Sequence, residues 1–153
     1  MNPKQQPGID FENVYLDSIN FKTNRQYKHT KQITLGPGFD YKYNIIKNKD
    51  GKTERLFALL SFNPFERPEE TPFSLHISII GLFSASKKSN MRLEYFAKEH
   101  APAHLLPFMR EIVANITSRT HYPLVLPPVN VLALIKSKKK VAPKRLKHSG
   151  RRK

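Results

Sequence analysis

The stretch LLPFMREIVANITSRTHYPLVLPPVN, residues 105–130, joins an amphipathic helix to a proline-rich loop and decides the fold of this chain. Apolar residues recur at three- and four-residue spacing over 105–116, which predicts one buried helical face. Pro107 lies early in that pattern, so either it kinks the helix or the helix proper begins there. Arg110 and Arg119 lie off the apolar face.

The loop that follows the helix contains three prolines between positions 122 and 129. Proline fixes φ and donates no backbone hydrogen bond, so this segment is expected to be extended. Apolar residues resume over 129–135 and predict a short second helix. The decisive stretch therefore predicts a long helix, an extended loop and the start of another helix.

The chain before this stretch alternates between apolar and polar residues, which predicts four β-strands. In the first strand, Tyr15, Ile19 and Phe21 fall on one face, which Asp17 interrupts, and Leu16 lies on the other face. The strands are expected at residues 14–23, 33–45, 54–62 and 73–83.

The connections between these strands indicate how they are arranged. Gly36-Pro37-Gly38 breaks or bulges the second strand, and Asp50-Gly51 predicts a hairpin turn after it. Residues 91–100 predict a helical turn or two, and Ala101-Pro102 marks a boundary because the residue before proline avoids the helical region. The predicted fold is α+β: a four-stranded antiparallel meander packed with one long helix and a short second helix.

Length and charge divide the chain into three parts. A chain of 153 residues without cysteine fits one domain with a single core, and we expect a flexible leader over 1–12, a folded domain over 13–135 and a disordered basic tail over 136–153. The tail holds ten lysines and arginines and no acid, which is ten of the fifteen net positive charges. The leader lacks an apolar signal core and no apolar run is long enough to cross a bilayer, so we expect a cytoplasmic protein without membrane insertion.

Several short motifs occur in an order that is specific to one family. Leu106-Pro107-Phe108 is followed by Arg110-Glu111, the helix exit ends in Tyr122-Pro123, Pro128-Val129-Asn130 opens the second helix, and Gly81-Leu82-Phe83 closes the fourth strand. Together they resemble the SecB export chaperones and their SecB-like relatives. The resemblance covers about residues 12–135 and is strongest over 105–130.

The resemblance implies a function and a site. It implies a holdase that binds unfolded chains or preproteins without ATP, for export or for stabilisation of an antitoxin, and that assembles as a homotetramer, a dimer of dimers. The helix over 105–116 and strands one and four would supply the subunit contacts. The implied client groove lies between the second strand, the proline loop and the second helix, and consists of Ile33, Leu35, Leu124, Leu126, Val131, Leu134 and Ile135, with Phe39 and Tyr41 as weaker candidates. Each of these apolar residues has the alternative interpretation of ordinary core.

Two features depart from the family pattern. Positions that are acidic in the family correspond to Ser18, Lys22 and His76, so docking to the basic tail of the export motor SecA is expected to be weak or repulsive. After Ile135 the lysine run replaces the family's long second helix. The chain is therefore expected to be a divergent, basic relative, either a stand-alone holdase or a partner of a toxin–antitoxin system.

The basic tail supports an alternative function as a nucleic-acid-associated module. Ten positive charges bind nucleic acid without sequence preference and with strong salt dependence. The competing interpretation is a solubilising tail that attracts clients. Base-specific recognition has no support, because neither a recognition-helix pattern nor an RNP-type motif is present.

Catalytic and metal-binding patterns are weak, so we expect neither an enzyme nor a cofactor. His100 and His104 have the spacing of two metal ligands on a helix, but Pro102 lies between them and no third ligand is evident. Glu69-Glu70 lies in a loop, and other paired carboxylates lie in a polar helical segment. The lack of cysteine excludes thiolate nucleophiles and the usual zinc knuckles.

Overall fold

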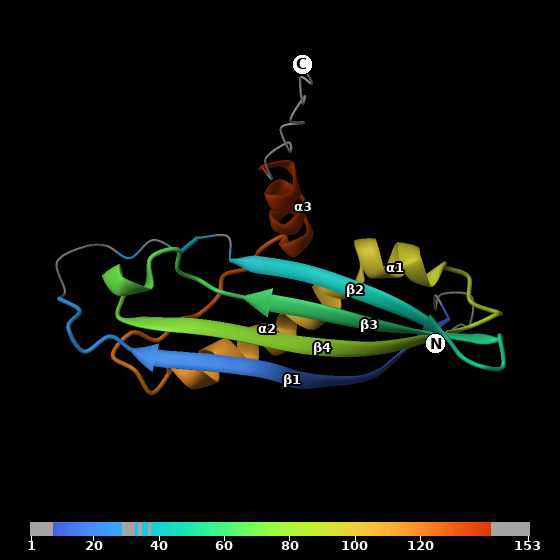
Figure 1. The fold of residues 1–153 in the computed structure, drawn as a ribbon, viewed down its shortest axis with the longest axis horizontal. Coiled ribbons are helices and arrows are strands. Elements are labelled where there is room, and N and C mark those ends of the chain that lie inside the picture. Colours follow the sequence, from blue (N-terminus) through green and yellow to red (C-terminus); the bar gives the residue numbers. More distant parts are fainter. Residues whose placement is uncertain (1–7, 29–32, 34, 37, 142–153) are drawn as a thin grey trace, which may run out of the picture.

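The computed structural model describes residues 8–28, 33, 35–36 and 38–141, and side chains as far as residue 137. Four strands form one antiparallel sheet in the order β1-β4-β3-β2, and α2 lies along one face of it (Figure 1). The strands are β1 (Ile9–Thr23), β2 (Phe39–Lys47), β3 (Thr53–Phe62) and β4 (Phe73–Ser86), and the helices are η2 (Pro68–Glu70), α1 (Leu93–Glu99), α2 (Ala101–Thr117) and α3 (Val131–Val141).

The predicted α+β class is confirmed, but the predicted order of a simple meander is wrong. Strands β2, β3 and β4 do follow one another as a meander, whereas β1 crosses to the far side and pairs with β4. The physical reason lies in β4, whose side chains are buried or half-buried on both faces for most of its length. Such a strand belongs inside a sheet, and β1 supplies its second neighbour.

The structure moves the predicted starts of two strands. Strand β1 begins at Ile9, inside the expected flexible leader, because Ile9 and Phe11 pair with the end of β4. The second strand begins at Phe39 rather than at Ile33. A Cβ atom at position 38 would lie 1.6 Å from the Asn63 carbonyl oxygen, so only glycine fits there. The Asn63 N–H donates a hydrogen bond to the Gly38 carbonyl oxygen, and the chain enters β2 through this close backbone contact.

Bulges reverse the predicted faces of β1. The register shifts at Glu12 and at Asp17, and each shift inserts one residue. Leu16 therefore shares a face with Ile19 and Phe21, and Tyr15 points to the opposite face. The sequence pattern placed Tyr15 with Ile19 because it assumed an uninterrupted two-residue period.

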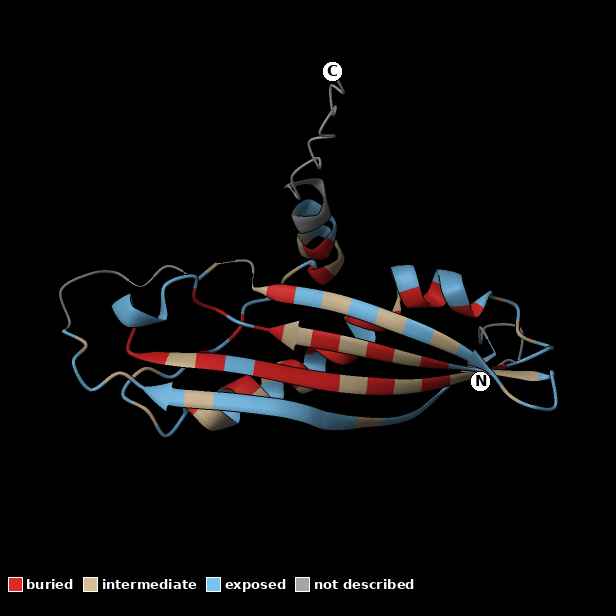
Figure 2. Ribbon diagram, viewed as in Figure 1, coloured by how far each residue is buried: buried red, intermediate tan, exposed pale blue. Residues whose placement is uncertain are grey.

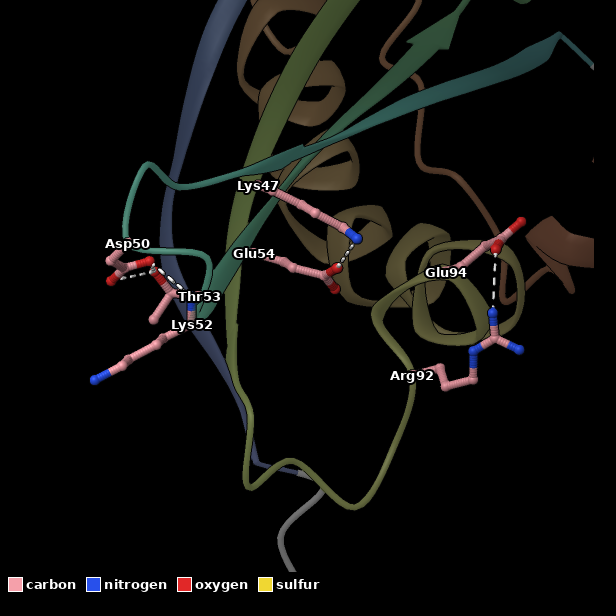
Figure 3. Close-up of polar contacts among 7 residues, drawn as sticks. All are labelled: Lys47, Asp50, Lys52, Thr53, Glu54, Arg92 and Glu94. Carbon is pink, nitrogen blue, oxygen red and sulfur yellow. Dashed lines mark hydrogen bonds and ion pairs between the residues drawn. The ribbon is translucent and has the colours of Figure 1, made fainter.

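The β2–β3 hairpin turns at the predicted Asp50-Gly51, where Gly51 has a positive φ of 62°. The Asp50 carboxylate accepts hydrogen bonds from the backbone N–H groups of Lys52 (2.9 Å) and Thr53 (3.3 Å), and these bonds lower the pKa of Asp50 (Figure 3). Lys47 and Glu54 face each other across the strands at 4.0 Å. The turn is therefore specified by local chemistry.

The core lies between the helices and one face of the sheet, here called the helix face. Buried residues alternate along β3 and β4, whereas β1 is largely exposed (Figure 2). Leu105 of α2 reaches this face at Gly81, where a Cβ atom would lie 2.4 Å from the Leu105 side chain. The glycine of the Gly81-Leu82-Phe83 motif therefore permits the close approach of the long helix.

Helix α2 begins at the predicted boundary with Pro102 in its first turn, and Pro107 lies inside it rather than at its start. Helix α3 continues to Val141, so the first residues of the expected disordered tail are helical. Lysine has good helix propensity, and Lys136 pairs with Glu99 of α1 at 3.0 Å. The lysine run thus extends the second helix, and the expectation that it ends at Ile135 is wrong.

Candidate functional site

The proline loop is attached to the end of α2 by one buried hydroxyl group. Thr117 is fully buried, and its hydroxyl donates to the Val113 carbonyl oxygen (2.8 Å) and accepts from the Leu124 N–H (2.8 Å). This bond fixes the loop so that Leu124 and Leu126 point inward and Val125, between them, is 78% exposed. The sequence offered no signal for Thr117, because its role depends on a contact seven residues away.

Helix α3 begins directly after Asn130, the last residue of the Pro-Val-Asn motif. The Asn130 side-chain oxygen accepts a hydrogen bond from the Ala133 N–H at 3.1 Å, which is an N-cap. The helix then buries Val131 and Ile135, which are 2% and 6% exposed. These two residues therefore anchor α3 to the core.

The predicted groove residues divide into two groups. Ile33 and Leu134 are half-buried and Leu35 is 40% exposed, so these three reach the surface. The other four predicted residues pack into the core of this chain, which is the alternative interpretation that the sequence left open for them: Leu124, Leu126, Val131 and Ile135. A short amphipathic helix must bury its apolar face to be stable, which explains the burial of the last two.

An aromatic surface of β2 lies beside α1 and α3, both of which contact this strand. Tyr41 and Tyr43 are half-buried on the helix face, with ring centroids 6.0 Å apart. The Tyr41 hydroxyl donates to the Ala97 carbonyl oxygen of α1 at 2.7 Å, and burial raises the pKa of Tyr41 well above its usual value. Phe39, the other weak candidate, is buried.

The ends of α1 carry charged contacts at the rim of this surface. Glu94 binds Lys98 at 3.0 Å and Arg92 at 3.8 Å, the latter shown in Figure 3. The hydrogen bond from Lys98 lowers the pKa of Glu94 and raises that of Lys98. These groups are exposed, so they keep the rim polar and solvated.

A second apolar surface lies between β1 and α2, two of the elements that the resemblance connected with subunit contacts. Phe11, Leu16 and Ile19 lie on the helix face, because each pairs with a buried core residue of β4. These three side chains are nevertheless 43–50% exposed. The Phe11 ring lies 5.6 Å from that of Phe108, the motif aromatic of α2. We call this surface the β1–α2 strip, which also includes the half-buried Ile112 and Ile116. Strand β1 also forms one edge of the sheet.

The face of the sheet opposite the helices is here called the open face. Ser18, Lys22 and His76 are all exposed on this face. His76 is a β4 residue directed away from the core, and Ser18 and Lys22 pair with two other such residues, Ser78 and Ser74. The structure thus brings together the three positions that the resemblance connected with SecA docking. None of the three is acidic, and Lys22 is basic.

Among the remaining motif residues, the two aromatic ones pack against other rings. Phe83 packs against Phe96 with ring centroids 5.0 Å apart, and Tyr122 is half-buried against Tyr27 at 5.6 Å. Pro123 and Pro128 are exposed. Arg110 lies partly buried on α2, and within the described residues its Nε atom has no hydrogen-bond partner.

The two spaced histidines pack on an aromatic ring. His100 and His104 lie 5.8 and 5.4 Å from Phe96, centroid to centroid. Across the described part of the chain no group of three or more His, Asp or Glu side chains is placed to hold a metal ion. In the same part, no helix is both long and apolar enough to cross a membrane.

The fold and its motif residues agree with a family match over almost the whole chain. Residues 2–142 match the family described as "SecB: Preprotein translocase subunit SecB". The chain belongs to the SecB family. Within the SecB family, it is 26% identical over 135 residues to the protein-export protein SecB of Acidithiobacillus ferrooxidans, covering 86% of this chain and 89% of the relative. It is also 23% identical over 130 residues to an uncharacterized protein of Methanocaldococcus jannaschii, covering 83% and 82%.

Solved structures show the same fold. A SecB-like chaperone of Mycobacterium tuberculosis, solved in complex with a ChAD peptide from the HigA1 antitoxin, superposes with a TM-score of 0.53 at 16% identity and covers 79% of this chain and 90% of that one. A Streptococcus agalactiae protein of unknown function gives a TM-score of 0.55 at 12% identity, covering 78% and 97%. The α+β arrangement is therefore that of SecB-like chaperones.

Proposed function

We propose that this SecB-family protein is an ATP-independent holdase that binds unfolded polypeptides through exposed apolar side chains. The observation that carries the proposal is the rigid proline loop, in which Val125 is 78% exposed while its neighbours are buried. Val125 is one of several apolar side chains that reach the surface of this chain, and sets of exposed apolar residues mark sites of protein–protein contact. Family membership supports a chaperone role, and binding of this kind needs no catalytic group.

The proposed client surface consists of the predicted groove residues that remain accessible, the two tyrosines of β2 and Val125 of the proline loop. Each client side chain that is buried there contributes roughly 1.5–3 kcal/mol before entropy costs, so one contact is weak. Several such surfaces in one oligomer bind an extended chain by avidity without sequence specificity. The surface comprises Ile33, Leu35, Tyr41, Tyr43, Val125 and Leu134.

The test is suppression of aggregation of a chemically unfolded client, without ATP. Leu35→Asp with Val125→Asp changes two exposed residues, so the fold is expected to survive while protection falls to about a tenth of the wild-type level. The matched control is Ile46→Asp with Tyr15→Asp, which places the same charges on exposed apolar residues of the open face. Equal protection by the Leu35/Val125 variant and the wild type would remove this surface from the proposal.

We propose that the chain works as a homo-oligomer, a dimer of dimers. The β1–α2 strip and the free edge of β1 support this proposal, because an uncovered apolar edge strand is a template for pairing with another chain. A closed assembly would cover these residues and place several client surfaces on one particle.

Two partner classes remain part of the proposal. Preproteins are natural clients for the export-named relatives, and an antitoxin peptide is bound by the SecB-like chaperone of Mycobacterium tuberculosis. The absence of acid at Ser18, Lys22 and His76 favours a role without a basic SecA tail. Binding measurements with a SecA tail peptide and an antitoxin segment test this, and tight SecA binding would contradict it.

The second candidate function is nonspecific binding of nucleic acid through the basic C-terminal region. The observation in its favour is the run of ten lysines and arginines without an acid over residues 136–153. Since α3 extends to Val141, the informative truncation removes residues 142–153 and leaves the described helix intact. Undiminished affinity for single-stranded DNA after this truncation excludes residues 142–153, which hold six of the ten cations, as its cause.

A further inference from the structure

A pocket of about 400 Å³ lies at the end of the molecule where β1 and α2 both finish. One wall is formed by the last residues of β1 and the turn after them, and the other by the last turn of α2 and the loop that follows it. Both segments lie at the same end of the sheet in Figure 1. The pocket is distinct from the β2 surface that we propose for general client binding.

The floor and one side of the pocket are aromatic. Phe73 is almost completely buried at its base, and the half-buried Phe21 ring lies 5.3 Å from it, centroid to centroid. Tyr27 and Tyr122 come from opposite walls and meet edge to face at 5.6 Å. The interior therefore suits an apolar or aromatic side chain.

The rim of the pocket is cationic. Arg25 stands on the β1 wall and Arg119 on the α2 wall, where His121 also lines the pocket as a neutral imidazole in the charge count. None of the residues described as lining the pocket is an aspartate or a glutamate, and neither arginine forms an ion pair with any residue that the structure describes. Arg25 also borders an adjoining hollow, where Lys22 adds a further positive charge.

Hydrogen bonds fix the backbone that carries both arginines. The Asn24 side chain donates to the carbonyl oxygens of Glu69 (3.1 Å) and Thr71 (3.0 Å), which ties the chain before Arg25 to η2 and the residue that follows it. On the other wall, the Thr120 hydroxyl donates to the Thr117 carbonyl oxygen (2.7 Å) and accepts from the Tyr122 N–H (3.0 Å). The backbone at the two arginines is therefore held beside the aromatic floor, and their exposed side chains extend from it.

We propose that this pocket binds a carboxylate-bearing segment of an extended client chain, with a neighbouring aromatic or branched aliphatic side chain on the aromatic floor. A guanidinium group matches a carboxylate both in charge and in planar shape, whereas an ammonium group matches it in charge alone. The basic tail of this chain carries no acid and so does not fit the rim. This inference rests on the proposed holdase function and adds a preference for acidic segments to it.

The test uses two short labelled peptides that differ only at the centre, Phe-Glu-Leu in one and Phe-Gln-Leu in the other. We expect the wild-type protein to bind the Glu peptide about tenfold more tightly, the effect of one charge-assisted hydrogen bond. Arg25→Gln with Arg119→Gln removes that preference and leaves the affinity for the Gln peptide within about twofold. Lys42→Gln with Arg55→Gln is the control, because it removes the same charge from exposed residues of the open face.

Aggregation suppression by the same proteins separates this inference from the proposed function. If the wild type protects an unfolded client but binds both peptides equally, the pocket assignment falls and the holdase function stands. If it neither protects a client nor binds either peptide, both fall. If the two double variants lose the preference for the Glu peptide equally, the preference comes from overall charge and the pocket assignment is wrong. A short single-stranded oligonucleotide that displaces the Glu peptide from the wild type but does not bind the Arg25/Arg119 variant assigns the pocket to nucleic acid instead.

Discussion

Glycine 81 sets how closely the long helix approaches the sheet. Its missing side chain leaves room for Leu105, which is fully buried and so has little space to move. The same residue belongs to the Gly81-Leu82-Phe83 motif that the sequence shares with its family. The motif thus has a packing reason at this residue.

We predict that Gly81→Ala destabilises the fold by about 1–3 kcal/mol, because the added methyl group overpacks the contact with Leu105. Urea unfolding measures the change in the free energy of unfolding. Gly36→Ala is the control, since a Cβ atom there meets only the Glu66 side chain at ordinary contact distance. A change below about 0.5 kcal/mol at Gly81 would show that α2 shifts freely.

Tyrosine 41 connects β2 to α1 and makes the fold sensitive to alkaline pH. Burial, with a smaller contribution from Tyr43, raises the pKa of Tyr41 in the folded state above the ordinary value of about 10. Its neutral form is thus favoured by folding. Its contribution to stability is complete below about pH 10 and is lost as the pH rises, because the unfolded chain ionises first.

We therefore predict that Tyr41→Phe costs about 1 kcal/mol at pH 7, where the hydrogen bond to Ala97 is lost, and that this cost shrinks above about pH 10. The free energy of unfolding in urea, measured for both proteins between pH 7 and 10.5, checks this. Parallel pH profiles of the wild type and the variant would contradict the buried, hydrogen-bonded state of Tyr41.

At the scale of elements, the proline loop and α3 depend on contacts that join them to α2. Thr117 provides the first of these contacts and Asn130 begins the next helix with its N-cap. The prolines restrict the backbone between these two points. The exposed position of Val125 is therefore a property of the whole segment.

We predict that Thr117→Val lowers the free energy of unfolding by about 1–3 kcal/mol and loosens the loop, because the buried N–H of Leu124 loses its acceptor. Thr117→Ser keeps the hydroxyl group and is the control. Amide hydrogen exchange over residues 118–130, together with urea unfolding, measures both effects. Unchanged protection of this segment in the valine variant would mean that the prolines alone hold it.

The sequence predicted the elements well where a pattern is local. The buried face of α2, the hairpin at Asp50-Gly51 and the helical turns before Ala101 were all confirmed, because each depends on residues that are close in the chain. Strand β1 was less predictable, since the bulges at Glu12 and Asp17 reverse its faces. A bulge is stabilised by the partner strand and leaves little signal in the strand that contains it.

At the scale of the molecule, the β1–α2 strip leaves apolar side chains of an edge strand and of the long helix exposed. The strip joins an edge strand to the flank of the long helix, and its residues are apolar although they contact water. Burying it in an assembly would add the hydrophobic stabilisation that the isolated chain lacks.

We predict that Leu16→Lys with Ile19→Lys reduces the oligomer to smaller species while the chain stays folded, because both side chains are about half exposed. Solution mass at low micromolar concentration, with circular dichroism as the check on folding, measures this. Asn13→Lys with Asn20→Lys adds the same charge to exposed residues on the open face and is expected to leave the mass unchanged. A monomeric wild type would contradict the proposed assembly.

The sequence by itself determined the element types, the decisive helix–loop–helix region and the family. Periodicity, proline positions and motif order all depend on residues that are close together in the chain, so they can be read without the tertiary structure. Only the tertiary structure decided that β1 pairs with β4, that Val131 and Ile135 are core while Leu35 and Val125 face water, and that Arg25 and Arg119 share a pocket. The physical reason is that an apolar pattern shows which side chains avoid water. Which surface covers them depends on pairings between residues far apart in the chain.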